Sequence, residues 1–387
     1  MRSLKYSAHN HLTILQNGGE YFPALLKAIE AASEEIYFET YIFALDDVGH
    51  AVKDALKRAA SRGVEVHVIT DWLGTGHVVG SRLESELLAA GVYHRSFNPW
   101  FRRGIARTHR KICVVDGKVA FVGGINITDD LRYDYDPKQR LPAPRWDFAI
   151  RVEGTLVAQI HRETESEWAR QGKLHLLSRL VLMRDELVAS HRVVGRDGLA
   201  GFVVRDNLHN RRTIQRAYLR AIGHAKQSVV MANPYFAPGS KFRNALAAAA
   251  ARGVEVTLLL GVGEFWLQDS VAQSMYPKML KRGIRLYEYR KTQLHGKVAV
   301  VDNIWATVGS SNIDGLSLFL NHEANVVVRD AAFVKDLRAH ITAAIAEAAP
   351  ISLDDFDNRP WYKRLGYNLA YMFYRMLMRI VTLGDYT

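Results

Sequence analysis

The sequence predicts an α/β fold in which one structural unit occurs twice along the 387-residue chain. The pattern H-x-K-x4-D occurs first at His109 and again at His295, 186 residues later. The segment S-R-G-V-E-V of residues 61–66 returns as A-R-G-V-E-V at residues 251–256, 190 residues later. Nearly constant offsets indicate an internal duplication. Each half is therefore expected to carry one copy of the motif.

Both halves show the same order of expected elements. A helix leads to a strand, an amphipathic helix, a second strand, a third helix that ends at a glycine, and a short strand before the motif. Such alternation predicts a mixed sheet with helices in each half. In the first half the elements are expected at 23–32, 35–42, 48–56, 64–70, before Gly91 and at 92–97. In the second half they are expected at 210–225, 228–235, 241–252, 254–260, before Gly283 and at 284–289.

The duplication also predicts the domain organisation. We expect an N-terminal domain over residues 1–180, a C-terminal domain over 190–350 and a basic amphipathic segment over 351–387. The joint between the halves is expected within 175–205. Residues 132–145 are expected to be a loop insertion that the second half lacks.

The composition limits the possible partners. A formal net charge of +11 and a pI near 9.6 indicate an anionic partner, either nucleic acid or an acidic membrane surface. The N-terminus has no apolar h-region, so no signal peptide is expected. No apolar run reaches the length of a spanning helix, so any membrane contact is expected to be peripheral. Cys113, the one cysteine, excludes an intrachain disulfide and is expected to be a buried thiol.

The parity of a strand divides the motif residues into two groups. Alternate side chains point to opposite faces, so His109, Lys111 and Cys113 are expected on one face of the motif strand. Asp116 has the other parity, and we expect it to fix its strand end rather than to touch a substrate. The second copy repeats this pattern with His295, Lys297 and Asp302.

This pair of motifs is suited to phosphodiester chemistry. Fixed cations and amide donors neutralise phosphate oxygens before a nucleophile approaches, and the residues expected in this role are Lys111, Lys297, Asn126 and Asn312. Histidine can start neutral on one side of the phosphorus and protonated on the other. We predict that one histidine forms a phosphohistidine, while the other protonates the leaving alcohol and then takes a proton from the incoming one. No cofactor is required, and no metal is expected, since the lysines would repel a cation.

Each histidine also needs an acceptor that orients its second ring nitrogen. Asp147 and Glu323 stand at comparable places after the two motifs and are the residues expected in this role. The alternative is that both are charges on the surface of a strand.

The two motifs resemble the HKD signature of the phospholipase D superfamily, whose members combine two such motifs in one active site. The resemblance extends to bacterial cardiolipin synthases along most of residues 12–330. The absence of N-terminal spanning helices makes the chain similar to the shorter, B-type enzymes. The further matching segments are Y-F-E-T-Y-I-F at 37–43, D-D-V-G at 46–49, N-P-Y-F-A-P at 233–238, Y-E-Y at 287–289 and S-N-I-D at 311–314.

The resemblance implies a duplicated α/β/α sandwich, with a pseudo-twofold axis between the halves and the active site on it. It implies transfer of a phosphatidyl group between two phosphatidylglycerol molecules with release of glycerol. By analogy, His109 is the nucleophile and His295 the general acid. The segment from Asp314 to Ser317 departs from relatives, which usually carry an arginine before the serine, so head-group preference stays open. A hydrolytic phospholipase D and a nuclease or other phosphodiesterase are the alternative functions.

Two loops favour a membrane over nucleic acid. Between Glu86 and Asp116 there is no acidic residue, and Pro99-Trp-Phe101 lies among six cations: Arg95, Arg102, Arg103, Arg107, Arg110 and Lys111. Cations beside aromatic rings suit a lipid interface, although they could also stack the bases of a single strand. The corresponding loop of the second half, 261–270, holds Phe265-Trp-Leu267 with Glu264 and Asp269 but no Lys or Arg, which suits acyl chains better than a phosphate backbone. The alternative is that both aromatic clusters pack into the core.

The C-terminal segment has the profile of an interfacial amphipathic helix. At helical spacing the apolar residues of this segment form one stripe, and three arginines form a neighbouring stripe. The apolar stripe comprises Leu365, Leu369, Met372, Met376, Ile380 and Leu383. The arginines are Arg364, Arg375 and Arg379. The alternative is a helix docked on the body of the protein. We therefore expect a peripheral enzyme at the cytoplasmic face of a bacterial membrane, with phospholipid substrates and no nucleic acid partner; the sequence does not reveal the oligomeric state.

Overall fold

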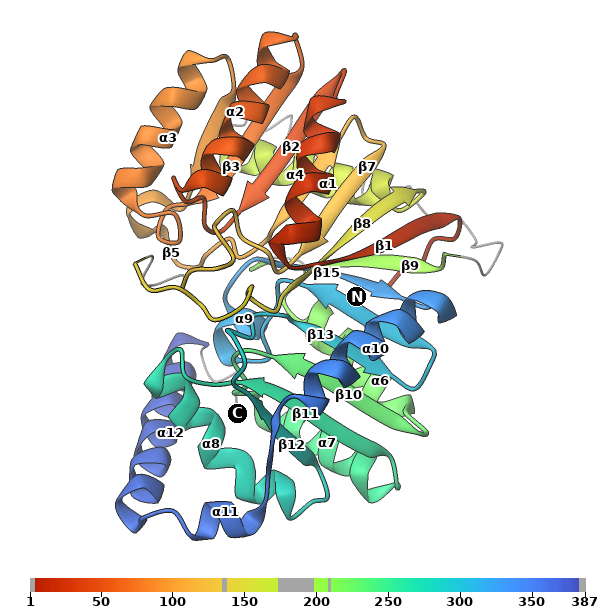
Figure 1. The fold of residues 1–387 in the computed structure, drawn as a ribbon, viewed down its shortest axis with the longest axis vertical. Coiled ribbons are helices and arrows are strands. Elements are labelled where there is room, and N and C mark those ends of the chain that lie inside the picture. Colours follow the sequence, from red (N-terminus) through yellow and green to blue (C-terminus); the bar gives the residue numbers. More distant parts are fainter. Residues whose placement is uncertain (1–3, 134–137, 173–197, 208–209, 383–387) are drawn as a thin grey trace.

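The computed structural model describes residues 4–133, 138–172, 198–207 and 210–382. Within these residues the chain forms a seven-stranded and an eight-stranded sheet, one in each half (Figure 1). The strand orders are β1-β8-β7-β6-β2-β3-β4 and β16-β12-β11-β10-β13-β14-β15-β9. In each sheet three neighbouring strands are parallel, β2 to β4 and β10 to β12, and the other pairings are antiparallel. The predicted pair of mixed sheets is confirmed.

The elements of the first half lie between residues 10 and 171. Its strands are β1 (Asn10–Gln16), β2 (Glu35–Thr40), β3 (Glu65–Asp71), β4 (Tyr93–Phe97), β5 (Arg102–Ile105), β6 (Ile112–Val115), β7 (Val119–Gly123) and β8 (Phe148–Gly154). Its helices are α1 (Asn17–Glu30), α2 (Asp47–Ser61), α3 (His77–Ala89) and α4 (Val157–Gln171), with a single 3₁₀ turn at Pro99–Phe101.

The elements of the second half lie between residues 200 and 381. Its strands are β9 (Ala200–Arg205), β10 (Ser228–Asn233), β11 (Glu255–Gly261), β12 (Arg285–Tyr289), β13 (Val298–Val301), β14 (Trp305–Gly309), β15 (Glu323–Val328) and β16 (Ala349–Ile351). Its helices are α6 (Thr213–His224), α7 (Ser240–Ala251), α8 (Trp266–Leu280), α9 (Gly315–Phe319), α10 (Ala331–Ala346), α11 (Leu353–Asp357) and α12 (Trp361–Val381).

Three apolar cores hold these layers together. One core lies between the first sheet and α1, α2 and α3, and a second lies between the second sheet and α6, α7 and α8. The central core joins the inner faces of both sheets with α4 and α10. Each sheet is thus covered by helices on its outer face and by α4 or α10 on its inner face, which confirms the predicted α/β/α sandwich. Because the central core contains side chains of both halves, the halves are packed as one body.

Local sequence explains where the helices begin and end. Asp46 caps α2 by accepting a hydrogen bond from the N–H of Gly49 at 2.8 Å. Gly49 has no room for a side chain, because a Cβ there would lie 1.8 Å from the carbonyl oxygen of Ala44. The third helices end just before Gly91 and Gly283, which have φ of 80° and 77°, a conformation that favours glycine.

The structure differs from the sequence analysis in two respects. The edge strands β1 and β9 were not predicted, and they extend the sheets by pairing with β8 and β15. The motif strands begin at Ile112 and Val298, so both motif histidines and lysines lie in the segments that lead into β6 and β13. The domain boundaries stay predictions, because most of the expected joint lies outside the described residues, as do Leu383 and residues 134–137 of the insertion.

The two motif aspartates fix the turns that follow the motif strands. Asp116 and Asp302 have φ of 50° and 49°, a left-handed conformation that aspartate tolerates. The Asp116 carboxylate accepts backbone hydrogen bonds from residues 33–35, at the junction of α1 and β2. The Asp302 carboxylate likewise accepts from residues 226–228 at 2.8–3.1 Å, just before β10. The expectation that these residues serve the scaffold is confirmed.

Replacing Asp302 with Ala should destabilise the second half. Three backbone N–H groups would lose a charged acceptor, which is expected to lower the free energy of unfolding by roughly 2–4 kcal/mol. The matched control is Asp336→Ala, since the Asp336 side chain is 63% exposed and its loss should cost little. Thermal unfolding followed by circular dichroism measures both variants. Equal unfolding midpoints would contradict this role of Asp302.

Candidate active site

The motif segments enter their strands at the boundary between the halves. The backbone N–H of His109 donates to the carbonyl oxygen of His322 at 2.9 Å, and that of His295 donates to Trp146 at 2.9 Å. Short parallel bridges join Thr108 to His322 and Trp146 to Leu294. Each motif is therefore held by the start of a strand of the other half, β15 or β8.

The two acids cross between the halves. Asp147 follows Trp146, and its Oδ2 lies 2.5 Å from Nδ1 of His295. Glu323 follows His322, and its Oε2 lies 3.1 Å from Nδ1 of His109. Both acids are almost fully buried, so the alternative of surface strand charges is wrong. The predicted contacts with ring nitrogens are confirmed, but the sequence did not indicate that each acid orients the histidine of the opposite half.

The surroundings of His109 fix its tautomer. Its Nδ1 also lies 3.0 Å from the carbonyl oxygen of Ser310, which can only accept a hydrogen bond. The proton must therefore be on Nδ1, which leaves the lone pair of Nε2 available. Burial lowers the pKa of His109, Glu323 raises it, and the positive charges of Lys111 and Lys297 lower it further; the net shift is downward. A neutral imidazole with an oriented lone pair is suited to act as a nucleophile.

The surroundings of Asp147 favour the ionised form of its carboxylate. Burial alone would raise its pKa, but His295 and Lys297 attract the carboxylate and lower the pKa to about 2. The N–H of Phe148 adds a hydrogen bond at 2.8 Å. An ionised Asp147 stabilises the protonated form of His295. The second histidine is thus suited to act as a general acid.

The two lysines are buried in equivalent positions. Nζ of Lys111 donates to the carbonyl oxygen of His109 at 2.8 Å, and Nζ of Lys297 donates to that of His295. Nζ of Lys111 lies 5.1 Å from the ring centre of Tyr41, and the His109 ring lies 4.9 Å from the same ring. Although the motif precedes its strand, histidine and lysine still reach a common neighbour. The sequence did not single out Tyr41.

The two asparagines lie in the same region but differ in their contacts. Oδ1 of Asn126 accepts from the N–H of Ile42 at 3.3 Å. Oδ1 of Asn312 is buried and has no hydrogen-bond partner among the residues described. Their role in binding phosphate stays a prediction.

Arg110, placed between the motif histidine and lysine, was assigned to a basic lipid-facing loop, and this is wrong. Its side chain is buried and lies 3.0 Å from Glu39 and 3.2 Å from Glu163. Arg95 is also turned inward, with its guanidinium 3.8 Å from the ring centre of Trp168. Burial raises the pKa of Glu39 to about 8 against the attraction of Arg110. The signal that could have revealed this pair is Glu39 itself, a carboxylate directly after the apolar run Ile36–Phe38 of β2.

Asp71 is a second buried acid that the sequence did not single out. Its Oδ2 accepts from the backbone N–H of Thr108 at 2.8 Å, one residue before His109. Burial raises its pKa to about 6. Asp71 thus anchors the first motif from β3 within its own half, while His322 anchors it from the other half.

Comparisons with known proteins agree with this fold and site. Residues 25–134 and 218–345 match the family described as cardiolipin synthase, PLD-like domain. The chain is 37% identical to cardiolipin synthase B of Salmonella typhimurium, over 96% of this chain and 89% of that protein. It is 30% identical to the probable cardiolipin synthase YwiE of Bacillus subtilis, over 96% of this chain and 73% of that protein. The chain belongs to the cardiolipin synthase family of phospholipase D-like proteins.

Solved structures show the same fold at low identity. Phosphatidylserine synthase of Haemophilus influenzae matches with a TM-score of 0.73 and 13% identity, over 98% of this chain and 97% of that chain. A polyphosphate kinase of Porphyromonas gingivalis matches with a TM-score of 0.54 and 15% identity, over 86% and 46% of the two chains. The expectation of a duplicated phospholipase D-like fold is confirmed.

The pKa of His109 tests the contact with Glu323. It should lie below the ordinary 6.5, and Glu323→Gln should lower it further, because the carboxylate is the group that raises it. NMR titration of ring-labelled histidine measures both values. The matched control is Glu165→Gln, at an exposed position of α4, which should leave the His109 titration unchanged. A higher or unchanged pKa in Glu323→Gln would contradict the contact.

Proposed function

We propose that the protein is a phosphatidyltransferase that makes cardiolipin from two phosphatidylglycerol molecules. The observation that carries this proposal is the crossed pair of histidines, each oriented by a buried acid of the other half. Two such imidazoles, one neutral and one favoured as a cation, can act on opposite sides of one phosphorus atom. The names of the relatives support a phospholipid as the substrate.

The roles of the two histidines follow from their surroundings. Nε2 of His109 attacks the phosphorus while His295 gives its proton to the departing glycerol oxygen, whose bond to phosphorus breaks. A hydroxyl of the second lipid then loses its proton to His295 and attacks the phosphohistidine, which releases His109. The buried ammonium groups of Lys111 and Lys297 offset the negative charge of the phosphate. Transfer differs from hydrolysis only in the hydroxyl that enters.

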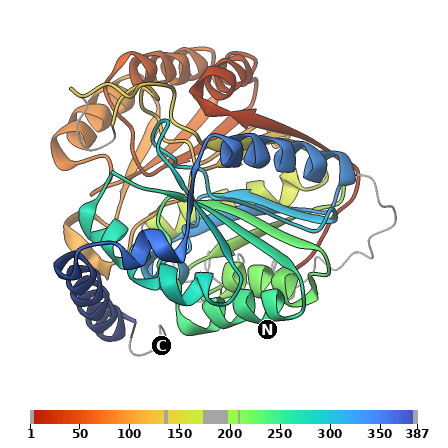
Figure 2. The same ribbon diagram turned by 60° about the horizontal axis from the view of Figure 1, so that its bottom comes forward.

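The proposed partner of the protein is an anionic phospholipid membrane, bound from the cytoplasmic face. Among the described residues, no helix has the length and apolar character needed to cross a membrane. Helix α12 packs along α8, and Ala370 of α12 belongs to the apolar core, so the alternative of a helix docked on the protein holds for this face. Among the described residues, the predicted stripe on the other face is 49–66% exposed at Leu365, Leu369, Met372, Met376 and Ile380. Figure 2 shows α12 at the periphery of the second half.

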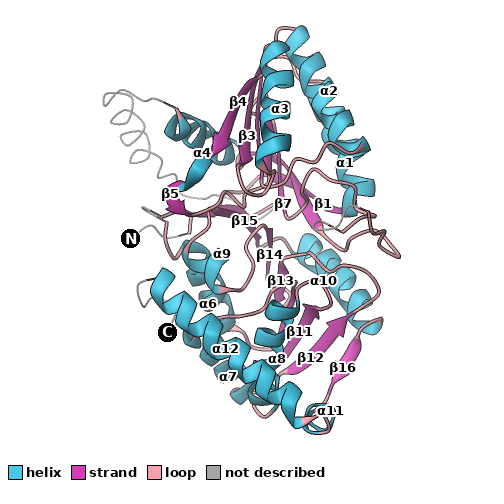
Figure 3. Ribbon diagram, turned by 90° about the vertical axis from the view of Figure 1, so that its left-hand side faces the viewer, coloured by secondary structure: helices cyan, strands magenta, loops and turns pink. Residues whose placement is uncertain are grey.

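Both aromatic loops contribute to the same proposal. Trp100 and Trp266 are 64% and 74% exposed, so the alternative in which these clusters pack into the core is wrong. Trp266 begins α8, along which α12 lies. Trp100 lies two residues before β5, and Figure 3 shows β5 and α12 on the side of the molecule that faces the viewer. These exposed rings, together with the exposed Arg375 and Arg379 of α12, suit the head-group region of an anionic bilayer.

Product analysis tests the transferase. Purified protein with phosphatidylglycerol vesicles should release cardiolipin and glycerol. His295→Ala should slow cardiolipin formation by about a hundredfold to ten-thousandfold, which is the range for loss of a general acid. His109→Ala should slow cardiolipin formation by at least the same factor. The control is His340→Ala, a half-buried histidine of α10. Phosphatidic acid as the sole product would favour hydrolysis, and cleavage of nucleic acid without lipid turnover would favour a nuclease.

Negative charges placed on the apolar stripe of α12 test whether this surface contacts a membrane. Leu369→Glu together with Met372→Glu should weaken binding to phosphatidylglycerol vesicles by at least about tenfold, because each exposed apolar side chain contributes roughly 1.5–3 kcal/mol when buried. The matched control is Ile304→Glu, since Ile304 is 57% exposed in the turn between β13 and β14. Co-sedimentation with vesicles measures binding. If the α12 variant binds as well as the control, this face does not contact lipid.

A further inference from the structure

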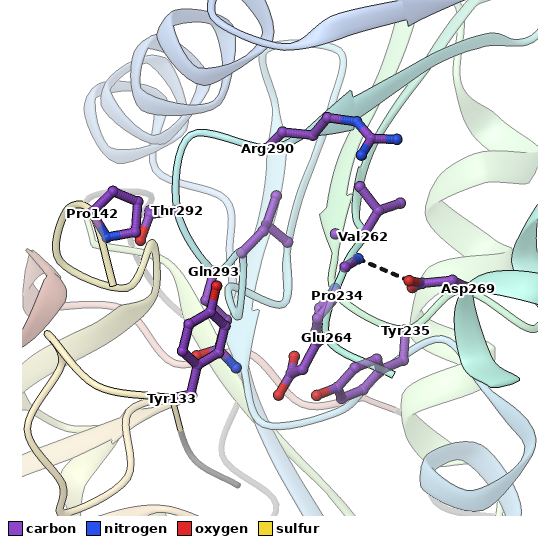
Figure 4. Close-up of a pocket in the computed structure, with 13 residues that line it drawn as sticks. Tyr133, Pro142, Pro234, Tyr235, Val262, Glu264, Asp269, Arg290, Thr292 and Gln293 are labelled. Atoms are coloured by element: carbon purple, nitrogen blue, oxygen red, sulfur yellow. Dashed lines mark hydrogen bonds between the residues drawn. The ribbon is translucent and has the colours of Figure 1, made fainter. Parts of the chain in front are cut away.

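A pocket is lined by Gln293 and Leu294, the two residues that precede His295 of the second motif, and Figure 4 shows the side chains around it. Its volume is about 210 Å³, which suits a small head group rather than a larger ligand. It is formed by both halves, from the insertion of the first half and from three loops of the second. The lining residues used below are Tyr133, Tyr235, Glu264, Asp269, Arg290 and Gln293.

The insertion of the first half is fastened to the wall of this pocket. Oγ1 of Thr292 donates to the carbonyl oxygen of Ala143 at 2.6 Å, and the N–H of Trp146 donates to that of Gln293 at 2.9 Å. The carbonyl oxygen of Trp146 also accepts from the N–H of His295. One residue thus supports both the pocket and the second histidine. The sequence of the second half has no counterpart of this insertion.

Gln293 supplies a buried donor. Its Oε1 accepts from Nε of Arg145 at 3.0 Å. A guanidinium can only donate, so the amide oxygen must face Arg145 and the amide nitrogen must face away. Nε2 is buried and has no hydrogen-bond partner among the residues described, and the side chain is 6% exposed. A buried donor without a partner is unfavourable, and a ligand in the pocket can supply the missing acceptor.

The charges of the pocket disfavour a phosphate. Glu264 and Asp269 contribute carboxylates. Among the described residues that line the pocket, Arg290 is the one cation, and it lies 2.5 Å from Glu288. A hydroxyl group can accept from Gln293 and donate to a carboxylate. An ammonium group can only donate, so it would leave the Gln293 amide unpaired. The lining therefore fits an uncharged polyol better than a phosphate or an amine.

We propose that this pocket binds the glycerol head group on the alcohol side of the reaction, with Gln293 and Glu264 as the residues that recognise its hydroxyls. The inference rests on the proposed transferase function. In a double displacement the leaving and the entering alcohol pass on the same side of phosphorus, opposite His109. One pocket beside His295 thus holds first the departing glycerol and then the glycerol of the acceptor lipid.

Competition between soluble alcohols tests the pocket. Vesicles of phosphatidylglycerol are incubated with equal concentrations of deuterated glycerol and ethanol, and mass spectrometry gives the ratio of deuterated phosphatidylglycerol to phosphatidylethanol. The native protein should favour glycerol, and Gln293→Ala should lower the ratio by about tenfold or more, since one hydrogen bond to an uncharged group is lost. The control Gln139→Ala truncates an exposed glutamine of the insertion and should keep the native ratio.

A second variant distinguishes the loss of glycerol recognition from misfolding. Glu264→Gln should also lower the ratio, because the carboxylate that accepts from a hydroxyl is lost, and circular dichroism checks that each variant is folded. An unchanged ratio in both folded variants, with transfer to alcohols intact, would contradict the role of the pocket in binding glycerol. The proposed transferase function would not be affected by that result. If the native protein transfers to no alcohol and yields phosphatidic acid alone, the proposed function fails instead, and the pocket with it.

Discussion

The crossed pairing between motif histidines and acids is the interaction on which the rest of the structure depends. Asp147 and Glu323 are buried charges, and a buried charge is tolerated only when it is paired and hydrogen-bonded. Their partners, His295 and His109, lie in the opposite halves. Neither half could bury its own acid alone, so the central core and the site must form together. This explains why the inner faces of both sheets share one apolar core with α4 and α10.

A symmetric scaffold nevertheless yields two different histidines. His109 shares its Nδ1 proton between Glu323 and the carbonyl oxygen of Ser310, whereas His295 has a short contact to Asp147 at 2.5 Å. Both acids have pKa values below the ordinary range in spite of burial, Asp147 because of His295 and Lys297 and Glu323 because of His109 and Lys111. The two histidines therefore differ in the groups that contact them and not in the residues of the motif itself. A duplicated pattern can therefore supply both a nucleophile and an acid.

Sequence reasoning predicted what local patterns determine and missed what depends on distant contacts. The paired motifs, the glycine-ended helices and the two acids were predicted, because periodicity and spacing encode them. The edge strands β1 and β9 were missed, since their role depends on pairing with β8 and β15. Arg110 was assigned to the lipid surface because the charge of a residue does not reveal that Glu39, 71 positions earlier, neutralises it inside the fold. The crossing of the acids likewise requires knowledge of how the halves pack.

Helix α8 connects the two surfaces that a lipid must reach. Its first residue, Trp266, is exposed in the apolar loop, and its body packs against the inner face of α12. One turn later, Asp269 accepts from the N–H of Gly263 at 2.8 Å and so holds the loop that carries Glu264 at the pocket. In the proposed function, acyl chains would stay with the exposed stripe of α12 while the head group enters the pocket lined by Gln293 and Leu294. Because α8 carries Trp266 and Asp269 and packs against α12, the proposal implies that the depth of the protein on the bilayer would determine which part of the lipid reaches the second histidine.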